Sequence, residues 1–452
     1  GPARRHATRG LLLLSGAHAW RNCNKKWRPL PDSSDDELGG CDVAVAQHGP
    51  RPRRQATGTA ARTLPPAGMT ALIQTPADAP TSPAATPALR LLPFDEATLP
   101  AAASLPTPQT PPLPAAAPAV PLPTFAQIEP IGLCNLACGM CTVNHRGDEV
   151  ATLSMDRYAA LLDAMPQLQS LHLQGLGEPM LHPQFFDMVS LAARRGIRVS
   201  ANTNLTLLTA KRAQRCIDSG LAALSVSLDG ATAPTFQAIR HGASFDKVVR
   251  NLGRLTDARD AAGSALEVRG VMVLMRSNLD ELPALVELLH AHRVHELLVQ
   301  RLSSDLEHEA LPPRYIPIRD YSRDAELRAE DLPHAAAVFE QAAQRARQLG
   351  LQLNLPALRP APAEAARAPG PRCSWPWEGL YFTAAGELLP CCMAATADRA
   401  SFGRVFEADA ASAHVHLDAA WNGNTAQRFR KGLTDDRPPS LCQSCALYHG
   451  TF

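Results

Sequence analysis

Short runs of strand-forming residues alternate with amphipathic stretches from Phe125 to about residue 302. Strands that alternate with helices of this length pair in parallel through right-handed crossovers. The pattern therefore predicts an α/β fold, a partial (β/α)6 TIM-like barrel two units short of a complete one. The predicted strands are 125–133, 170–176, 197–203, 221–230, 266–275 and 295–302, and the predicted helices are 154–165 with Ser154 as N-cap, 183–196, 209–220, 235–258 and 279–292.

The segments outside the barrel have a different texture. In residues 1–123, apolar residues follow neither the 3.6-residue period of a helix nor the 2-residue period of a strand. The segment is rich in alanine and proline, as in LPTPQTPPLPAAAPAVPLP. Such a segment cannot bury enough apolar surface to offset its ordering entropy, so a disordered N-terminal extension is predicted, with Cys23 and Cys41 unassigned. The barrel is predicted at 124–302, a helical connector and linker at 303–369, and a small second domain at 370–452.

Composition excludes several classes of protein. The formal charge of +1 gives no basic excess for a nucleic-acid partner, and no run approaches the roughly 18 apolar residues of a membrane span. The 11 cysteines are odd in number, and most lie in two groups at metal-ligand spacing. This usage favours thiolate–metal chemistry in a reducing compartment, so a cytoplasmic protein is predicted.

Three cysteines follow the first predicted strand. Cys134, Cys138 and Cys141 have the spacing C-x3-C-x2-C, at the barrel face where active sites are built. Structural zinc sites normally take four protein ligands, and [4Fe–4S] clusters are generally held by four cysteines. A set of three therefore indicates a metal centre with one open position. A zinc site that borrows His145 as its fourth ligand is the alternative.

The stretch EPIGLCNLACGMC, residues 129–141, resembles the cluster-binding loop of the radical S-adenosylmethionine (SAM) superfamily. The resemblance implies that Cys134, Cys138 and Cys141 hold a [4Fe–4S] cluster whose fourth iron binds SAM. Reductive cleavage of SAM would yield a 5′-deoxyadenosyl radical that removes hydrogen from a substrate C–H bond. Met140 stands where the family often has an aromatic residue.

Later motifs match the same superfamily at the ends of further strands. QGLGEPML resembles its GGEP-type motif, ANTNLTLL its TNGTLL motif with Leu205 in place of glycine, and SVSLDG a fourth strand end. Each could instead be a turn that satisfies local backbone groups. The resemblance implies SAM contacts at Gly175, Gly177, Glu178, Pro179, Asn202 and Ser227, with Thr203, Asn204, Arg276 and Asn278 on the same face.

A second cysteine set lies in the last domain, as Cys373-x17-Cys391 and Cys442-x2-Cys445. Four thiolates at this spacing indicate a closed metal site, for which a zinc ribbon is the alternative. The segment resembles the SPASM/twitch domain in its shorter form, which implies one auxiliary [4Fe–4S] cluster that relays electrons or holds the fold. The pair LPCC leaves open whether Cys391 or Cys392 is the ligand.

These observations predict a radical SAM enzyme with one auxiliary cluster. Dehydrogenation of a sugar or cyclitol-like small molecule is favoured, with Arg301 at the sixth strand end as substrate contact or base, or else as a salt-bridged barrel residue. A peptide maturase or epimerase, and a non-catalytic iron–sulfur or zinc protein, are the alternatives. A flavodoxin or ferredoxin is the predicted reductant, and Cys216 is predicted to be a buried structural thiol.

Overall fold

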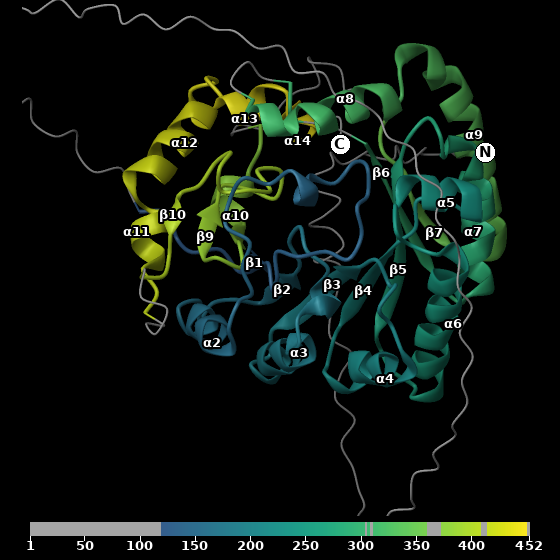
Figure 1. Cartoon of the computed structure of the whole chain (residues 1–452), viewed down its shortest axis with the longest axis horizontal. Coiled ribbons are helices and arrows are strands. Elements are labelled where there is room, and N and C mark those ends of the chain that lie inside the picture. The colour runs from purple at the N-terminus through teal and green to yellow at the C-terminus, as the bar shows by residue number, and fades with distance from the viewer. Residues whose placement is uncertain (1–118, 303–304, 308–310, 359–371, 408–413, 450–452) are drawn as a thin grey trace, which may run out of the picture. The chain divides into compact units, whose positions relative to one another are not determined.

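The fold is organised around a ten-stranded sheet in the order β10-β9-β8-β1-β2-β3-β4-β5-β6-β7 (Figure 1). The computed structural model describes residues 119–302, 305–307, 311–358, 372–407 and 414–449. Strands β1 to β7 pair in parallel, as predicted for a right-handed β/α series. The strands are β1 Phe125–Ile128, β2 Ser170–Leu173, β3 Arg198–Thr203, β4 Ala223–Ser227, β5 Glu267–Leu274, β6 Glu296–Arg301, β7 Gln352–Asn354, β8 Leu380–Phe382, β9 Glu387–Leu389 and β10 Gly403–Arg404.

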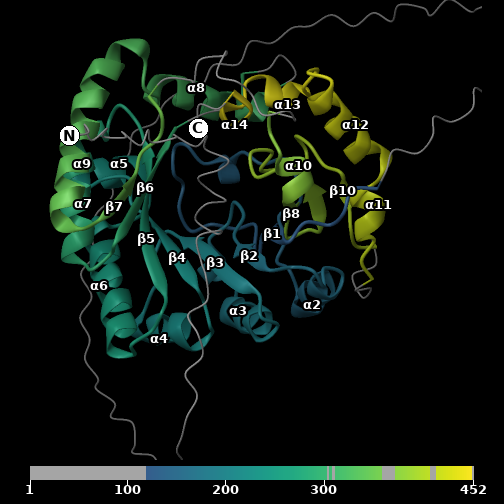
Figure 2. The same cartoon turned by 180° about the vertical axis from the view of Figure 1, so that it is seen from behind.

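Helices connect the parallel strands and cover one side of the sheet, as both views show (Figures 1 and 2). Ser154 caps α2 as predicted, because its hydroxyl accepts a 3.3 Å hydrogen bond from the Arg157 amide. The barrel helices are α2 Met155–Asp163, α3 Phe185–Arg194, α4 Ala210–Asp218, α5 Ala233–Ile239, α6 Phe245–Ala261 and α7 Leu282–Ala291, followed by α8 Ile316–Ala325 and α9 Leu332–Leu349.

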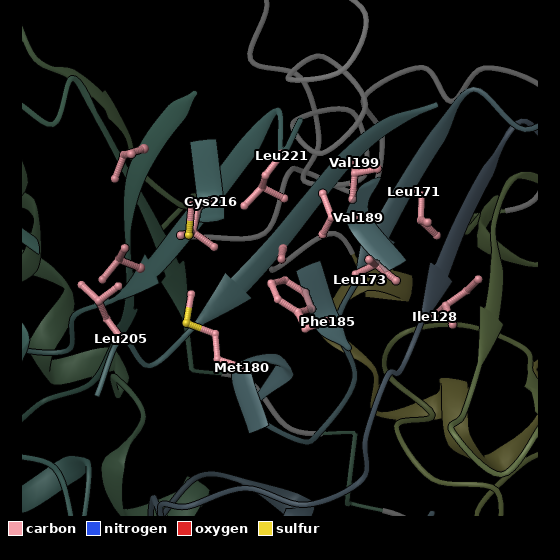
Figure 3. Close-up of a cluster of buried hydrophobic side chains, with 14 of the residues drawn as sticks. Ile128, Leu171, Leu173, Met180, Phe185, Val189, Val199, Leu205, Cys216 and Leu221 are labelled. Carbon is pink, nitrogen blue, oxygen red and sulfur yellow. The ribbon is translucent and has the colours of Figure 1, made fainter. Parts of the chain in front are cut away.

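Apolar and polar residues alternate along the first strands, so they lie on opposite faces of the sheet. Ile128, Leu171, Leu173 and Val199 are fully buried and pack against the helices in the main hydrophobic core (Figure 3). The residues between them are polar, and the strand register aligns Gln127, His172 and Ser200 across β1, β2 and β3. Successive residues of a strand point to opposite faces, so the face away from the helices is lined with hydrogen-bonding groups.

The C-terminal domain continues the sheet. Strand β8 pairs in parallel with β1, with Ala126 opposite Leu380 and Ile128 opposite Phe382. Strands β9 and β10 then add in antiparallel order. The remaining helices are α10 Trp375–Glu378, α11 Leu417–Trp421, α12 Asn424–Thr434, α13 Ser440–Gln443 and α14 Ala446–His449. The six predicted units are therefore extended at both edges, by β7 and by the domain that carries the second cysteine set.

The predicted N-terminal extension falls largely outside the described residues, as do Cys23, Cys41 and residues 359–371 of the linker. The first residues that the structure describes belong to the fold. The Val120 amide donates to the Asn422 side chain at 2.8 Å, and the Trp421 indole donates to the Val120 carbonyl at 3.0 Å. These bonds join the segment before β1 to helix α11 and the residue after it.

Candidate metal-cluster sites

The loop after β1 holds Cys134, Cys138 and Cys141 close together at the carboxyl edge of the sheet. Burial raises the pKa of all three thiols, that of Cys141 to about 11, and the charges of the neighbouring thiols raise those of Cys138 and Cys141 further. The charge of Cys134 acts on both Cys138 and Cys141, so the loop places the three thiols near one another. The three predicted ligands are thus assembled by one loop.

Two side chains from later loops direct N–H groups at these sulfurs. Asn204 Nδ2 lies 3.9 Å from Cys134 Sγ, and Arg240 Nη1 lies 4.0 Å from Cys138 Sγ. Arg240 is buried, and its Nε contacts Asp229 Oδ2 at 2.8 Å. Hydrogen bonds and positive charge near thiolate sulfur stabilise the electron-rich state of a bound cluster. The surroundings of the loop therefore suit an anionic iron–sulfur centre.

Glu178 joins the second and third strand-end motifs. Its carboxylate is buried and accepts hydrogen bonds from the Thr203 hydroxyl at 2.7 Å and the Asn204 amide at 2.8 Å. Burial raises the pKa of this carboxyl group. Gly177 packs against the cysteine loop, since a Cβ there would lie 1.9 Å from the Ile131 carbonyl oxygen. The motif is positioned against the loop by contacts that only glycine permits.

The other predicted SAM contacts lie at the same edge of the sheet. Asn202 is on β3 and Ser227 ends β4, and both side chains are half-buried. Leu205, which stands where the resembled TNGTLL motif has glycine, adopts a left-handed φ of 59°, so this turn forms with leucine. The roles of Asn202 and Ser227 in SAM binding stay predictions.

Three further residues have structural partners. Asn278 is buried and accepts the Met275 amide at 2.7 Å, which closes the turn after β5. Arg276 forms an ion pair with Asp331 at 2.9 Å. Arg301 donates to the Leu327 carbonyl at 2.9 Å and to the Leu358 carbonyl at 3.3 Å. These bonds tie β6 to the connector, and a catalytic role for Arg301 stays a prediction.

The second cysteine set is assembled from three segments of the C-terminal domain. Burial raises the pKa of Cys391, and the charges of Cys392, Cys445, Cys373 and Cys442 raise it further, so Cys391 lies near every other thiol of the set. Burial also raises the pKa of Cys392, and the charges of Cys445 and Cys373 raise it further, so this thiol too lies near the set. Cys392 also lines a cavity of about 160 Å³ that includes Met140 and Thr142 of the first cysteine loop. Cys391, which lies near all four other thiols, stays the predicted fourth ligand.

The chemistry of both cysteine sets suits iron–sulfur clusters. A [4Fe–4S] cluster takes one thiolate on each iron, so three thiols can hold three irons and four thiols can hold all four. The N–H groups of Asn204 and Arg240 near Cys134 and Cys138 suit the negative charge of such a cluster. Within the described ranges, no three His, Cys, Asp or Glu side chains converge on a single-ion site.

Sequence reasoning missed Arg240 and Glu129. Arg240 lies in AIRHG, which belongs to none of the motifs above, and it reaches Cys138 only because α5 ends beside the cysteine loop. Glu129 was visible inside EPIGLC, but no role was predicted for it. A carboxylate placed directly after a buried strand was the available signal, because buried charges require partners.

Comparisons with known proteins agree with this geometry. Residues 128–289 match the model of the radical SAM superfamily, and residues 373–446 match that of the SPASM iron–sulfur cluster-binding domain. The chain therefore contains a radical SAM domain followed by a C-terminal SPASM domain. The predicted fold is confirmed, and so are the cofactors that the family implies, [4Fe–4S] clusters and SAM.

Relatives with curated names match over part of their length. The tungsten-containing aldehyde ferredoxin oxidoreductase cofactor-modifying protein of Pyrococcus furiosus is 30% identical over 186 residues, which are 39% of this chain and 51% of that protein. The mycofactocin maturase MftC of Mycobacterium tuberculosis is 33% identical over 150 residues, 33% of this chain and 37% of that protein. The chain thus spans about half, or less, of these relatives.

Solved structures share the fold. Streptococcus suis SuiB bound to its precursor peptide SuiA superposes with a TM-score of 0.53 at 17% identity, covering 72% of this chain and 70% of that one. No helix in the described ranges combines the length and apolar character that crossing a membrane requires. The predicted cytoplasmic location stays a prediction.

Proposed function

We propose that the protein is a radical SAM enzyme that removes a hydrogen atom from an unactivated C–H bond of its substrate. The carrying observation is the set of three clustered thiols, which leaves one iron of a [4Fe–4S] cluster free, beside a separate set of four. When bound, the first cluster would supply the electron that cleaves SAM to methionine and a 5′-deoxyadenosyl radical.

The residues around the first loop have distinct tasks in this proposal. Cys134, Cys138 and Cys141 hold the cluster, and Arg240 offsets part of its negative charge. Glu178 accepts a hydrogen bond from the backbone amide of Asn204 and so fixes this residue in place. The side-chain amide of Asn204 then reaches Cys134 Sγ. The sulfur environment is thus set by groups that are already in place before SAM binds.

An apolar wall keeps water from one side of the loop. Met140 packs with Ile239, Met275, Leu302 and Tyr321 in one hydrophobic cluster. The Tyr321 ring covers the loop so closely that a Cβ at Gly139 would lie 2.6 Å from it. The family often has an aromatic residue just before the third cysteine, where this chain has Met140. Here Tyr321 of α8 provides an aromatic ring next to that part of the loop. Exclusion of water protects a reactive radical from side reactions.

The second thiol set would hold the auxiliary cluster through Cys373, Cys391, Cys442 and Cys445. Four protein ligands leave no iron open, so this cluster relays electrons and does not bind substrate. Burial is the main cause that raises the pKa of the Cys442 and Cys445 thiols, and the negative charge of Asp305 raises it further. The Asp305 carboxylate therefore lies near this site. A flavodoxin or ferredoxin is the proposed source of reducing electrons.

The cavity beside Cys392 supports a peptide side chain as the reacting group. Its 160 Å³ is below the roughly 300–1,000 Å³ of sites that enclose a whole small molecule. Its two charged residues, Asp305 and Arg399, pair with each other at 2.5 Å. A polyhydroxylated ring would leave hydroxyl groups unpaired there, which is costly. The lining is otherwise largely apolar: Met140, Leu302, Leu306, Ile318, Met393 and Ala395, with Thr142, Ser322 and Cys392.

The names of two relatives describe maturation or modification of another molecule. One is a maturase of mycofactocin and the other modifies the cofactor of an oxidoreductase. We therefore favour maturation of a peptide or peptide-derived cofactor. Dehydrogenation of a sugar or cyclitol is the second candidate, favoured by the single closed thiol set, which can accept one electron from a substrate radical.

Anaerobic reconstitution tests the proposal. The protein is loaded with iron and sulfide, its iron is counted, and dithionite and SAM are added while 5′-deoxyadenosine is measured. About eight irons per chain and formation of 5′-deoxyadenosine are expected. Zinc alone, or two clusters without SAM cleavage, would instead support a non-catalytic metal protein.

Deuterated substrates then separate the two candidates. Precursor peptides encoded near the gene, and a panel of sugars and cyclitols, are supplied with the C–H positions deuterated. Transfer of deuterium into 5′-deoxyadenosine from a peptide side chain supports maturation. Transfer only from a ring carbon of a polyol supports dehydrogenation and contradicts the cavity argument.

A further inference from the structure

The Glu129 carboxylate sits where three parts of the molecule meet. It follows β1 directly and is fully buried. Its Oε1 accepts the Leu176 amide of the GLGEP motif at 2.9 Å, and its Oε2 accepts the Ala384 amide at 3.1 Å, in the turn between β8 and β9. One carboxylate thus bridges a SAM-motif loop and the hairpin that leads to Cys391.

Arg146 balances this charge from the far end of the cysteine loop. Its Nη1 lies 3.3 Å from Glu129 Oε1, and its Nε lies 2.7 Å from Asp148 Oδ1. Asp148 in turn accepts the Ala397 amide of the auxiliary domain at 3.0 Å. All three side chains are at least nine-tenths buried. Buried charges with so many fixed partners hold one geometry, because losing any partner is costly.

Two glycines leave room for the Glu129 and Arg146 side chains, because a side chain at either glycine would collide with them. A Cβ at Gly175 would lie 2.3 Å from Glu129 Cγ, and one at Gly132 would lie 2.6 Å from Arg146 Nη1. Gly175 belongs to the GLGEP motif and Gly132 to the approach to Cys134. The backbone of both loops is therefore packed directly on the two charged side chains.

We infer that Glu129 is a positioning residue that couples the SAM-binding loop to the auxiliary-cluster hairpin. The coupling acts through the Leu176 and Ala384 amides, with Arg146 as counter-charge. The Glu129 amide also donates to the Phe382 carbonyl at 2.9 Å, so backbone and side chain hold the same hairpin. The role of the GLGEP loop in SAM binding rests on the proposed function.

Glu129→Gln tests the coupling because it keeps the shape and removes one acceptor. A carboxamide can accept only one of the two amides through oxygen, and its NH2 group then faces a donor. Hydrogen exchange is followed in peptides 172–178 and 382–388, and SAM affinity is measured on the cluster-loaded protein. We expect faster exchange in both peptides and SAM binding weakened roughly tenfold, with iron content unchanged.

Asp148→Asn is the matched control. It removes a charge from the same network, but the hydrogen-bond partners of Asp148 are Arg146 and the Ala397 amide, not Leu176 or Ala384. We expect faster exchange around residue 397 and SAM affinity within about twofold of the wild type. Equal loss of SAM affinity in both variants would overturn the inference, because any disturbance of the loop would then suffice. Unchanged exchange and affinity in Glu129→Gln would overturn it as well.

Glu129→Asp covers the case in which the glutamine variant does not fold. It keeps the charge for Arg146 but is one methylene too short to reach both amides. The same exchange and affinity changes are expected, and wild-type behaviour in this variant would refute the coupling. Absence of SAM cleavage by the wild-type protein would defeat the proposed function alone, since the exchange measurement does not depend on activity.

Discussion

At the residue scale, two neighbouring cysteines differ in what they contact. Cys391 packs with Tyr381, Leu389 and Leu441, and its pKa is raised by burial and then by the charges of all four other thiols nearby. Cys392 lies in the turn that follows, near Cys445 and Cys373, and also lines the cavity on the side of the first cysteine loop. Cys391 therefore stays the predicted fourth ligand, and Cys392 is the alternative.

Removing each thiol in turn should separate their roles. Cys391→Ala is expected to lose the auxiliary cluster and retain about four irons per chain, whereas Cys392→Ala retains about eight. Iron and sulfide analysis with electron paramagnetic resonance of the reduced protein checks both. Equal loss of iron in the two variants would contradict the assignment of Cys391.

At the element scale, helix α5 is capped by a residue from another segment. Glu281, which precedes α7, accepts the Ala231 amide at 2.6 Å and the hydroxyls of Thr232 and Thr235 at 2.5 and 2.6 Å. Partial burial opposes ionisation, but these hydrogen bonds lower the pKa of the Glu281 carboxyl group overall. The carboxylate satisfies donors that a helix N-terminus leaves free. Glu281 also holds helix α5, which Arg240 follows directly.

Glu281→Gln should weaken this cap. We expect a loss of about 1 kcal/mol in the free energy of unfolding at neutral pH. A carboxylate with a lowered pKa stabilises above its unfolded pKa, so the difference from wild type should shrink as pH falls. Urea unfolding at several pH values measures it. Glu287→Gln, which removes an exposed ion pair with Arg345, should change stability by less than about 0.5 kcal/mol.

At the scale of the whole molecule, the polar face of the sheet contains a buried histidine. His172 Nδ1 lies 2.8 Å from the Ser200 hydroxyl, and Nε2 lies 2.6 Å from Gln174 Oε1. Burial, and to a smaller extent the charge of Arg269, lower the pKa of His172 from 6.5 to about 4. The folded protein therefore holds this ring neutral.

Stability should fall with acidity through this histidine. Between pH 6.5 and about 4 the unfolded chain binds a proton that the folded protein does not, so His172 alone should remove up to about 3 kcal/mol as pH falls across that window. Unfolding midpoints of apo protein against pH measure the slope. His172→Gln should flatten it and His334→Gln, on the surface, should not. An unchanged slope in His172→Gln would refute the assignment.

Much of the fold followed from local pattern. The alternation of strands and helices and the Ser154 cap both appear in the structure. Gly196 and Gly220, the last residues of two predicted helices, have positive φ angles of 75° and 78°. The three-cysteine loop was equally visible, because its members lie at short, characteristic spacings, and the second set was visible through its Cys442-x2-Cys445 pair. The pairing of β8 with β1 was not visible, because it joins residues more than 250 positions apart and no local pattern marks two such segments as partners.

The sequence by itself determined the class of protein: a parallel β/α barrel, a loop of three cysteines and a separate set of four. The barrel depends on local periodicity, the three-cysteine loop on spacing within one short segment, and the set of four on a short pair, Cys442 and Cys445, with two cysteines upstream. Only the tertiary structure decided which buried charges serve them. Glu129 and Arg240 reach their partners across loops that the sheet brings together, and that convergence is a property of packing, not of any segment alone.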